Sequence, residues 1–249
     1  MKKTIAMLLV CMLMLMGCAM AEKITMGSSC DFPPYEYYDD ETGEIVGIDV
    51  EIAYAVAEKL GYELEIQDMQ FDSIIAAVCS GKVDIGMSGF TVTEERKQNV
   101  DFSTPYTTAK QSVLVPAETS ITSVDDLFNV ENAYKIGVQI GTTGDLYITG
   151  DVEANGLQHS VERYNKYGDA VMALLSGKID CMIVDDQVAV SFAEANEGLA
   201  LLDTAYALEE YAVCFAKESP LYDPFNAALE ELIADGTVQS IIDKYIVSD

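Results

Sequence analysis

Eleven residues, Gly86 to Arg96 (GMSGFTVTEER), carry side chains whose types and spacing suit recognition of a small charged molecule. Arg96 is one of only two arginines among 249 residues. A guanidinium presents a planar fork of donors that fits a carboxylate through two hydrogen bonds. The preceding loop adds the hydroxyls of Ser88 and Thr91 and the backbone carbonyl of Gly89. One cationic fork beside neutral donors and acceptors suits a zwitterion such as a free amino acid.

A strand followed by a helix is expected to position this loop. The strand is predicted over 83–87, and Thr93 has the character of a helix N-cap, with Glu94 and Glu95 in the first turn. This arrangement leaves an alternative open. Arg96 could simply pair with Glu94 or Glu95 on a solvated helix.

Two further loops in the second half of the chain could contribute chemistry. Residues 139–144 (QIGTTG) follow a predicted strand, 136–138, and such a small-residue loop exposes backbone N–H groups that suit an anion. It is not a phosphate loop, because no Gly-Lys-Ser/Thr follows. The apolar strand predicted over 179–184 ends in Asp185 and Asp186, where buried parallel strands often present functional groups.

An internal repeat indicates how these loops are organised. Residues 71–84 (FDSIIAAVCSGKVD) and 167–180 (YGDAVMALLSGKID) align without gaps at an offset of 96 residues. Both read as a helix, a glycine stop and a strand, although any unit of this kind would look somewhat similar. We interpret the repeat as two related α/β lobes, each with a mostly parallel sheet covered by helices.

Hydrophobic periodicity and turn residues predict the remaining elements. Asp72 is expected to cap a helix over 73–80, and Ser123 to open a short helix with a capping box. A loop containing Pro33 and Pro34 is expected to leave the first strand. The other predicted strands are 24–26, 62–66, 111–115, 199–202, 207–211 and 212–215, and the other helices are 48–60, 220–234 and 238–245. The predicted boundaries are 18–110 and 207–249 for lobe 1, and 111–206 for lobe 2.

The N-terminus has the pattern of an export signal, predicted over residues 1–17. A basic start precedes an apolar run, 4–16, which is shorter than the roughly 20 residues that span a bilayer. Leu-Met-Gly-Cys at 15–18 resembles the lipobox of bacterial lipoproteins, which predicts lipidation of Cys18. A signal peptide without a lipid is the alternative. The mature protein is therefore expected outside the cytoplasm, periplasmic or lipid-anchored to the outer face of the cell membrane.

Composition limits the partners. Lys plus Arg total 14 against 42 Asp plus Glu, a net charge of −28 that repels nucleic acid and anionic lipid. The four cysteines beyond Cys18 are predicted to be buried free thiols, although export also permits disulfides in three pairings: Cys30, Cys79, Cys181 and Cys214. The pattern predicts neither a metal nor a cofactor. The single histidine, His159, lies in a polar stretch.

Six segments carry a resemblance to a known family. They are FPPYEY (32–37), GIDVEIAYAVAEKLG (47–61), FDSIIAAV (71–78), TVTEERKQNVDFSTPY (91–106), IGVQIGTTGD (136–145) and IDCMIVDD (179–186). Over essentially the whole mature length, the chain resembles the extracytoplasmic substrate-binding proteins of polar amino-acid ABC transporters. This resemblance implies an α/β, two-lobed periplasmic-binding-protein-like fold, with two crossover strands and a central ligand cleft.

The resemblance also implies roles for individual residues. Arg96 would hold the α-carboxylate of the ligand, helped by the backbone N–H groups of Thr91 and Thr143. Asp185 would take the α-ammonium together with the Gly89 carbonyl, and the Thr91 hydroxyl is a further acceptor. Phe32 and Phe71 would flank the ligand side chain, with core packing as the alternative for each. The full predicted ligand-binding set is Arg96, Asp185, Thr91, Gly89, Ser88, Phe32, Phe71, Thr142, Thr143, Ser29 and Gln139.

The identity of the ligand is less clear from the sequence. Related binders of basic amino acids or glutamine have an acid where Ser29 stands, and Asp31 could substitute for it or be exposed. Gln139 could contact the side chain or face solvent. We predict a monomer that binds a free polar amino acid, neutral or basic, and delivers it to an ABC permease. The alternatives are a sensing module for a partner receptor and a dehydratase-like enzyme on the same fold.

Overall fold

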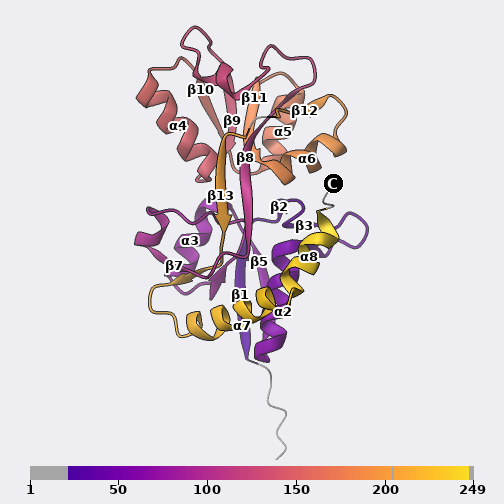
Figure 1. The fold of residues 1–249 in the computed structure, drawn as a ribbon, viewed down its shortest axis with the longest axis vertical. Helices are drawn as coiled ribbons and strands as arrows, with labels where there is room; N and C mark the ends of the chain where they lie inside the picture. The colour runs from indigo at the N-terminus through magenta and orange to yellow at the C-terminus, as the bar shows by residue number, and fades with distance from the viewer. Residues whose placement is uncertain (1–21, 204, 247–249) are drawn as a thin grey trace, which may run out of the picture.

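The chain folds into two lobes joined by two long strands (Figure 1). The computed structural model describes residues 22–203 and 205–246, so the predicted signal peptide and Cys18 lie outside the described residues. The two-lobed α/β architecture predicted from the sequence is confirmed. The prediction of a mostly parallel sheet in each lobe is wrong, because each sheet combines parallel and antiparallel pairs in equal measure along its main path. Within the described residues, no helix is long and apolar enough to cross a membrane.

Lobe 1 is built on a five-stranded sheet in the order β5-β1-β6-β14-β7. Strand β1 is parallel to β5 and β6, whereas β14 is antiparallel to β6 and β7. The strands are β1 (Lys23–Ser28), β5 (Glu63–Asp68), β6 (Ile85–Gly86), β7 (Val100–Phe102) and β14 (Cys214–Ala216). The helices are α2 (Ile48–Leu60), α3 (Phe71–Cys79), α7 (Tyr222–Ala234) and α8 (Thr237–Tyr245).

Lobe 2 repeats this plan with the strand order β10-β9-β11-β8-β12. Strand β9 is parallel to β10 and β11, and β8 is antiparallel to β11 and β12. The strands are β8 (Thr107–Pro116), β9 (Lys135–Gln139), β10 (Ser160–Tyr164), β11 (Cys181–Asp185) and β12 (Leu199–Leu201). The helices are η2 (Val124–Phe128), α4 (Thr143–Asn155), α5 (Tyr167–Leu175) and α6 (Asp186–Ala195). The predicted capping box of Ser123 opens η2.

Strands β8 and β13 (Ala207–Tyr211) connect the lobes. They pair in antiparallel fashion and run from one lobe to the other (Figure 1). Strand β8 belongs to the sheet of lobe 2, and its first half pairs with β13 in the connection. The predicted boundary at 110/111 falls inside this strand, and the boundaries stay predictions.

The 96-residue repeat corresponds to one structural unit in each lobe. Helices α3 and α5 end before Gly81 and Gly177, whose φ angles are +70° and +68°. A carboxylate then ties the unit to the neighbouring strand. Asp84 Oδ2 accepts from the Thr25 N–H at 2.7 Å, and Asp180 Oδ2 accepts from the Lys135 N–H at 2.7 Å.

Several local predictions are wrong. Asp72 does not cap α3, because the helix begins at Phe71, two residues before the predicted start, and Gln70 is its N-cap. The helix expected after Thr93 is a single 3₁₀ turn, η1 (Arg96–Gln98), although the Thr93 hydroxyl does accept from the Arg96 N–H at 3.1 Å.

The proline segment is more ordered than a plain loop. Its flanks pair as strands in a small third sheet, formed by β2 (Asp31–Phe32), β3 (Glu36–Tyr38) and β4 (Ile45–Val46). Cys79 is exposed rather than buried, because it lies at the C-terminal end of α3, beyond the inward residues Ile74 and Val78. The other three cysteines are buried and free, as predicted.

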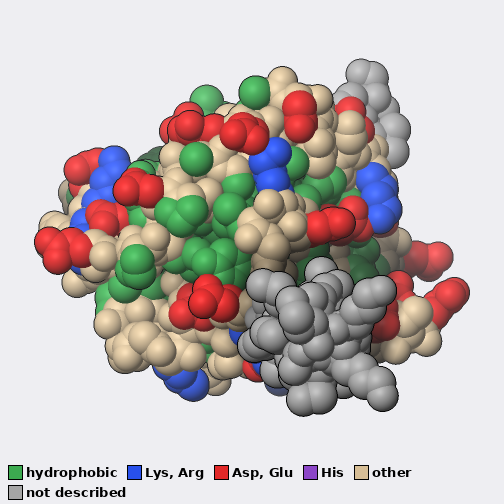
Figure 2. Space-filling view, turned by 90° about the horizontal axis from the view of Figure 1, so that it is seen from below, with side chains coloured by type: hydrophobic (Ala, Val, Ile, Leu, Met, Phe, Trp, Pro, Cys, Tyr) green, Lys and Arg blue, Asp and Glu red, His purple; other side chains and the backbone are tan. Residues whose placement is uncertain are grey.

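The surface has the acidic character expected from the composition. Seen from below, the face shows acidic side chains distributed around a central apolar area (Figure 2). Lysines lie among them, and some form exposed ion pairs such as Lys59–Glu231 and Lys23–Glu65. Pairs this exposed add little stability.

Candidate ligand-binding site

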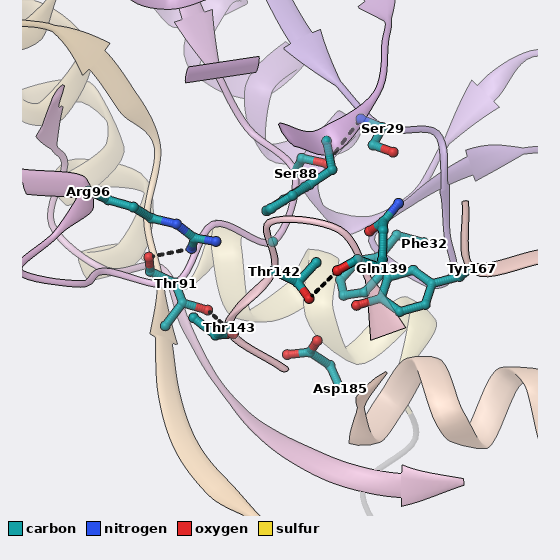
Figure 3. Close-up of a pocket in the computed structure, with 12 residues that line it drawn as sticks. Ser29, Phe32, Ser88, Thr91, Arg96, Gln139, Thr142, Thr143, Tyr167 and Asp185 are labelled. Carbon is teal, nitrogen blue, oxygen red and sulfur yellow. Dashed lines mark hydrogen bonds between the residues drawn. The ribbon is translucent and has the colours of Figure 1, made fainter. Parts of the chain in front are cut away.

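A narrow cavity lies between the lobes, and the space in and around it that no atom fills is about 290 Å³, open solvent included. All eleven predicted ligand-binding residues line it, together with Tyr167 (Figure 3). Lobe 1 contributes the loops after β1 and β6, and lobe 2 contributes the loop after β9 and the end of β11. The cavity therefore collects the C-terminal ends of strands from both sheets, where open α/β sheets bind ligands.

Arg96 points into this cavity and not toward the acids beside it. Its Nη1 donates to the Thr91 carbonyl at 2.8 Å, and its Nη2 donates across the cleft to the Gly141 carbonyl at 3.1 Å. Glu94 pairs instead with Lys97 at 2.8 Å, which argues against the alternative of a solvated surface pair for Arg96. Burial lowers the pKa of Arg96, but a guanidinium stays protonated in proteins.

Two aromatic rings hold the guanidinium in place. Its Cζ lies 5.4 Å from the ring centroid of Phe71 and 5.3 Å from that of Phe90, within the range of cation–π attraction. The two rings stack at 4.7 Å. Phe71 thus supports Arg96 as well as lining the cavity. Since only two of the five guanidinium donors are occupied by these carbonyls, donors remain for a carboxylate.

Asp185 lies on the lobe 2 side, where β11 ends and α6 begins. Its Oδ2 accepts from the hydroxyl of Tyr211, which comes from crossover strand β13. Burial, followed by the negative charge of Glu209, raises the pKa of Asp185 to about 8. A cation entering the cavity would favour the ionised form of this carboxylate and lower its pKa again.

The loop after β9 presents the start of α4 to the cavity. Thr142 is the N-cap, and its hydroxyl accepts from the Asp145 N–H at 3.3 Å. Thr143 is the first residue of the helix, so its N–H has no partner within the helix. Gln139 is only 2% exposed, which makes the solvent-facing alternative wrong, and its Nε2 donates to the Asn165 carbonyl at 3.1 Å.

Buried carboxylates lie beneath the lobe 1 side of the cavity. Ser88 donates to Glu36 Oε1 at 2.5 Å, and the Gly89 N–H donates to Asp49 Oδ2 at 2.9 Å. Burial, then the charge of Asp49, raises the pKa of Glu36 well above its ordinary value. Burial also raises the pKa of Asp49 to about 6. These acids hold the Ser88–Gly89 turn from below.

Asp31 connects the lobes at the other end of the cavity. Its Oδ1 accepts from the Ser29 hydroxyl at 3.1 Å, and its Oδ2 accepts from the Tyr167 N–H of lobe 2 at 2.7 Å. The exposed position considered for Asp31 is therefore wrong. Phe32 stacks on the Tyr167 ring at 5.4 Å, so it contacts lobe 2 as well as the cavity.

Two groups of residues at or beside the cavity were not predicted from the sequence. Tyr167 lies 96 residues after Phe71, so the repeat itself could have indicated it. Gln111, Glu209 and Tyr211 lie on the crossover strands, and no motif marked them.

The remaining chemical candidates are structural. His159 is buried, with Nδ1 accepting from the Tyr134 N–H at 3.0 Å and Nε2 bonded to the Leu127 carbonyl at 2.8 Å. Among residues 22–203 and 205–246, no group of three or more His, Cys, Asp or Glu side chains is placed to hold a metal ion.

The family of the chain follows from comparison with known proteins. The model of the bacterial extracellular solute-binding proteins, family 3, matches residues 24–248. The chain belongs to this family. These proteins are extracytoplasmic solute-binding proteins and not enzymes, which excludes the dehydratase alternative.

Individual relatives in family 3 cover nearly the whole chain. The "Arginine-binding extracellular protein ArtP" of Bacillus subtilis (strain 168) is 35% identical over 231 residues, which is 92% of this chain and 88% of that protein. Among solved structures, "An ancestral arginine-binding protein bound to arginine" is 35% identical with a TM-score of 0.83, covering 91% of this chain and 99% of that one. The structure titled "An ancestral arginine-binding protein bound to glutamine" also matches at 35% identity and a TM-score of 0.83, covering 92% and 100%.

Proposed function

We infer that the protein binds a free polar amino acid between its lobes and delivers it to an ABC permease for uptake. The observation that carries this inference is the joint position of Arg96 and Asp185. Both are buried, they come from different lobes, and they line one cavity. A zwitterion between them would satisfy a buried cation and a buried anion at once. Isolated buried charges are otherwise unfavourable.

The backbone of the ligand would be held at these two groups. We assign the α-carboxylate to Arg96, with the N–H groups of Thr91 and Thr143 beside it. The position of Thr143 at the start of α4 supports this, because a helix N-terminus favours an anion. We assign the α-ammonium to Asp185, with the Gly89 carbonyl and the Thr91 hydroxyl as further acceptors. Phe32 and Phe71 would flank the side chain of the ligand.

For the side chain of the ligand, we propose a basic group, with arginine as the first choice. The polar groups at the Ser29 end already use donors within the protein: Ser29 donates to Asp31, Ser88 to Glu36, and Gln139 to Asn165. Ser88 Oγ also accepts from the Ser29 N–H at 3.0 Å, so the lone pairs left at this end are mainly those of the Ser29 hydroxyl and the Gln139 side-chain oxygen, beside one further N–H of the Gln139 amide. Such a surface, with Asp31 and Glu36 behind it, favours a donor-rich cation and disfavours an acidic side chain. The arginine named in two relatives supports the same choice.

A binding screen tests the ligand. Co-purified ligand is removed, and the thermal unfolding of the protein is measured with each of the twenty amino acids. L-arginine is expected to give the largest rise, because a ligand at a hundredfold excess over Kd adds about 2.7 kcal/mol to the free energy of unfolding. A larger rise with glutamine would keep the backbone assignments and replace the basic side chain by a neutral amide. No rise with any amino acid would contradict the proposed function.

Finally, we propose that the protein is a monomer and that Cys18 carries a lipid anchor. The lipobox-like residues 15–18 support the anchor. Cell fractionation of the natural chain and of Cys18→Ala tests it. The natural chain is expected in the membrane fraction, and the variant is expected to leave it. Equal release of both would favour a signal peptide without a lipid.

A further inference from the structure

A third charged group, Glu209, lies behind Thr91, at the strands that connect the lobes. It belongs to crossover strand β13, and only 5% of its surface is exposed. Among charged side chains, it exerts the largest effect on the pKa of Arg96 and also on that of Asp185. Its carboxylate also contacts the hydroxyl of Thr91, which lines the cavity. None of the roles assigned above uses it.

The hydrogen bonds that Glu209 accepts determine the direction in which the neighbouring Thr91 hydroxyl donates its proton. Its Oε2 accepts from the Thr91 hydroxyl at 2.9 Å and from Nε2 of Gln111 at 3.0 Å. A hydroxyl has one proton, and Thr91 directs this proton to Glu209. The Thr91 oxygen therefore has only lone pairs left for a ligand. These lone pairs can accept a hydrogen bond from an ammonium, and they repel a carboxylate.

The second carboxylate oxygen of Glu209 also favours a cation over an anion nearby. Oε1 is buried without a hydrogen-bond partner among the described residues. A buried carboxylate oxygen without a donor is unfavourable unless a charge or a donor comes near. Glu209 does not itself line the cavity, but it adds a second buried carboxylate behind Thr91, besides that of Asp185.

We propose that Glu209 determines specificity for the α-ammonium of the ligand, by fixing the Thr91 hydroxyl as an acceptor and by placing a second buried carboxylate behind Thr91. This inference rests on the proposed function, since it assumes an amino acid in the cleft. It assigns to a crossover strand a part in recognition as well as in connecting the lobes.

The test compares two ligands that differ in this one group. L-arginine carries the α-ammonium, whereas 5-guanidinopentanoic acid keeps the carboxylate and the guanidinium and lacks it. Calorimetry measures both affinities for the wild type, Glu209→Gln and Glu210→Gln. Glu210 is the matched control, because it neighbours Glu209 on the same strand and its side chain is exposed.

The expected result is a selective loss. Glu209→Gln lowers the affinity for L-arginine about tenfold or more, as for loss of one charge-assisted hydrogen bond. Its affinity for 5-guanidinopentanoic acid stays within about threefold of the wild type, and Glu210→Gln changes neither. An equal loss for both ligands would show that Glu209 only supports the fold, and no loss would show that it has no role in binding. Either result overturns the proposal.

A second variant keeps the test valid if Glu209→Gln does not fold. Thr91→Val removes the hydroxyl and leaves strand β13 intact, and it should show the same selective loss. An equal loss for both ligands here would also contradict the proposal. If wild type binds another amino acid in the screen and not L-arginine, the proposed ligand fails independently. Glu209 is then tested with that amino acid and its des-amino analogue.

Discussion

At the scale of single residues, Arg96 is the side chain on which binding depends most. Its replacement by alanine would leave the α-carboxylate in a buried cavity without its cationic partner. We expect Arg96→Ala to weaken ligand binding by about 2–4 kcal/mol, measured by calorimetry. Lys97→Ala is the matched control, since Lys97 neighbours Arg96 and forms an exposed pair with Glu94. Wild-type affinity in Arg96→Ala would remove the carboxylate role.

Most residues around the cavity could be predicted because they lie in loops with a recognisable local pattern. Arg96 and Asp185 follow predicted strands, and Thr143 follows a small-residue loop. The residues just before each of them in the sequence therefore indicate where it lies in the fold. Glu209 could not be found this way. Its neighbour Glu210 has the same chemistry, and only the register of β13 against β8 turns one inward and the other outward. The binding roles themselves remain predictions.

At the scale of elements, strand β6 packs closely against its neighbours because Gly86 has no side chain. A Cβ at Gly86 would lie 2.6 Å from Cys214 Sγ and 2.9 Å from Ile74 Cγ2, so β14 and α3 pack directly on this strand. We expect Gly86→Ala to reduce the free energy of unfolding by about 1–3 kcal/mol. Gly150→Ala in α4 is the control, and we expect it to raise the free energy of unfolding. A Cβ there meets nothing within 4 Å, and alanine favours a helix by about 0.5–1 kcal/mol. Denaturant unfolding of both variants measures these changes, and unaltered stability of Gly86→Ala would contradict the close packing.

The elements that periodicity predicted well are the amphipathic helices and the buried strands. Helix α2 matches its predicted bounds, because its apolar face and the following Gly61 are both explicit in the sequence. The failures occur where tertiary contacts decide. The turn at Arg96 presents its guanidinium to Gly141 of the other lobe, and the proline segment becomes part of a small sheet because its two flanks pair with each other and with β4.

At the scale of the whole molecule, the structure is closed. Arg96 reaches Gly141, Asp31 reaches the Tyr167 N–H, and Lys166 approaches Asp68 at 3.7 Å, each across the cleft. Since β8 and β13 connect the lobes, we expect these two strands to be the hinge about which the lobes separate. Ligand binding and lobe closure should therefore be one equilibrium, and a change that hinders closure should weaken binding without touching the ligand.

Gly141 offers that change. A Cβ there would lie 3.1 Å from Cβ of Asp72 in the opposite lobe, so Gly141→Ala should oppose closure and weaken binding by about 1–2 kcal/mol. The φ of Gly141 is +78°, and alanine would add local strain as well. Gly156→Ala controls for that strain, because its φ is +62° and nothing lies within 4 Å of its Cβ. It should lose stability and keep its affinity. Replacing Asp72 by glycine in the Gly141→Ala background should restore part of the affinity, since it removes the opposing Cβ. Calorimetry measures the ligand affinity of the wild type, the two single variants and the double variant. Full affinity in Gly141→Ala, or no recovery in the double variant, would mean that closure does not bring Gly141 and Asp72 together.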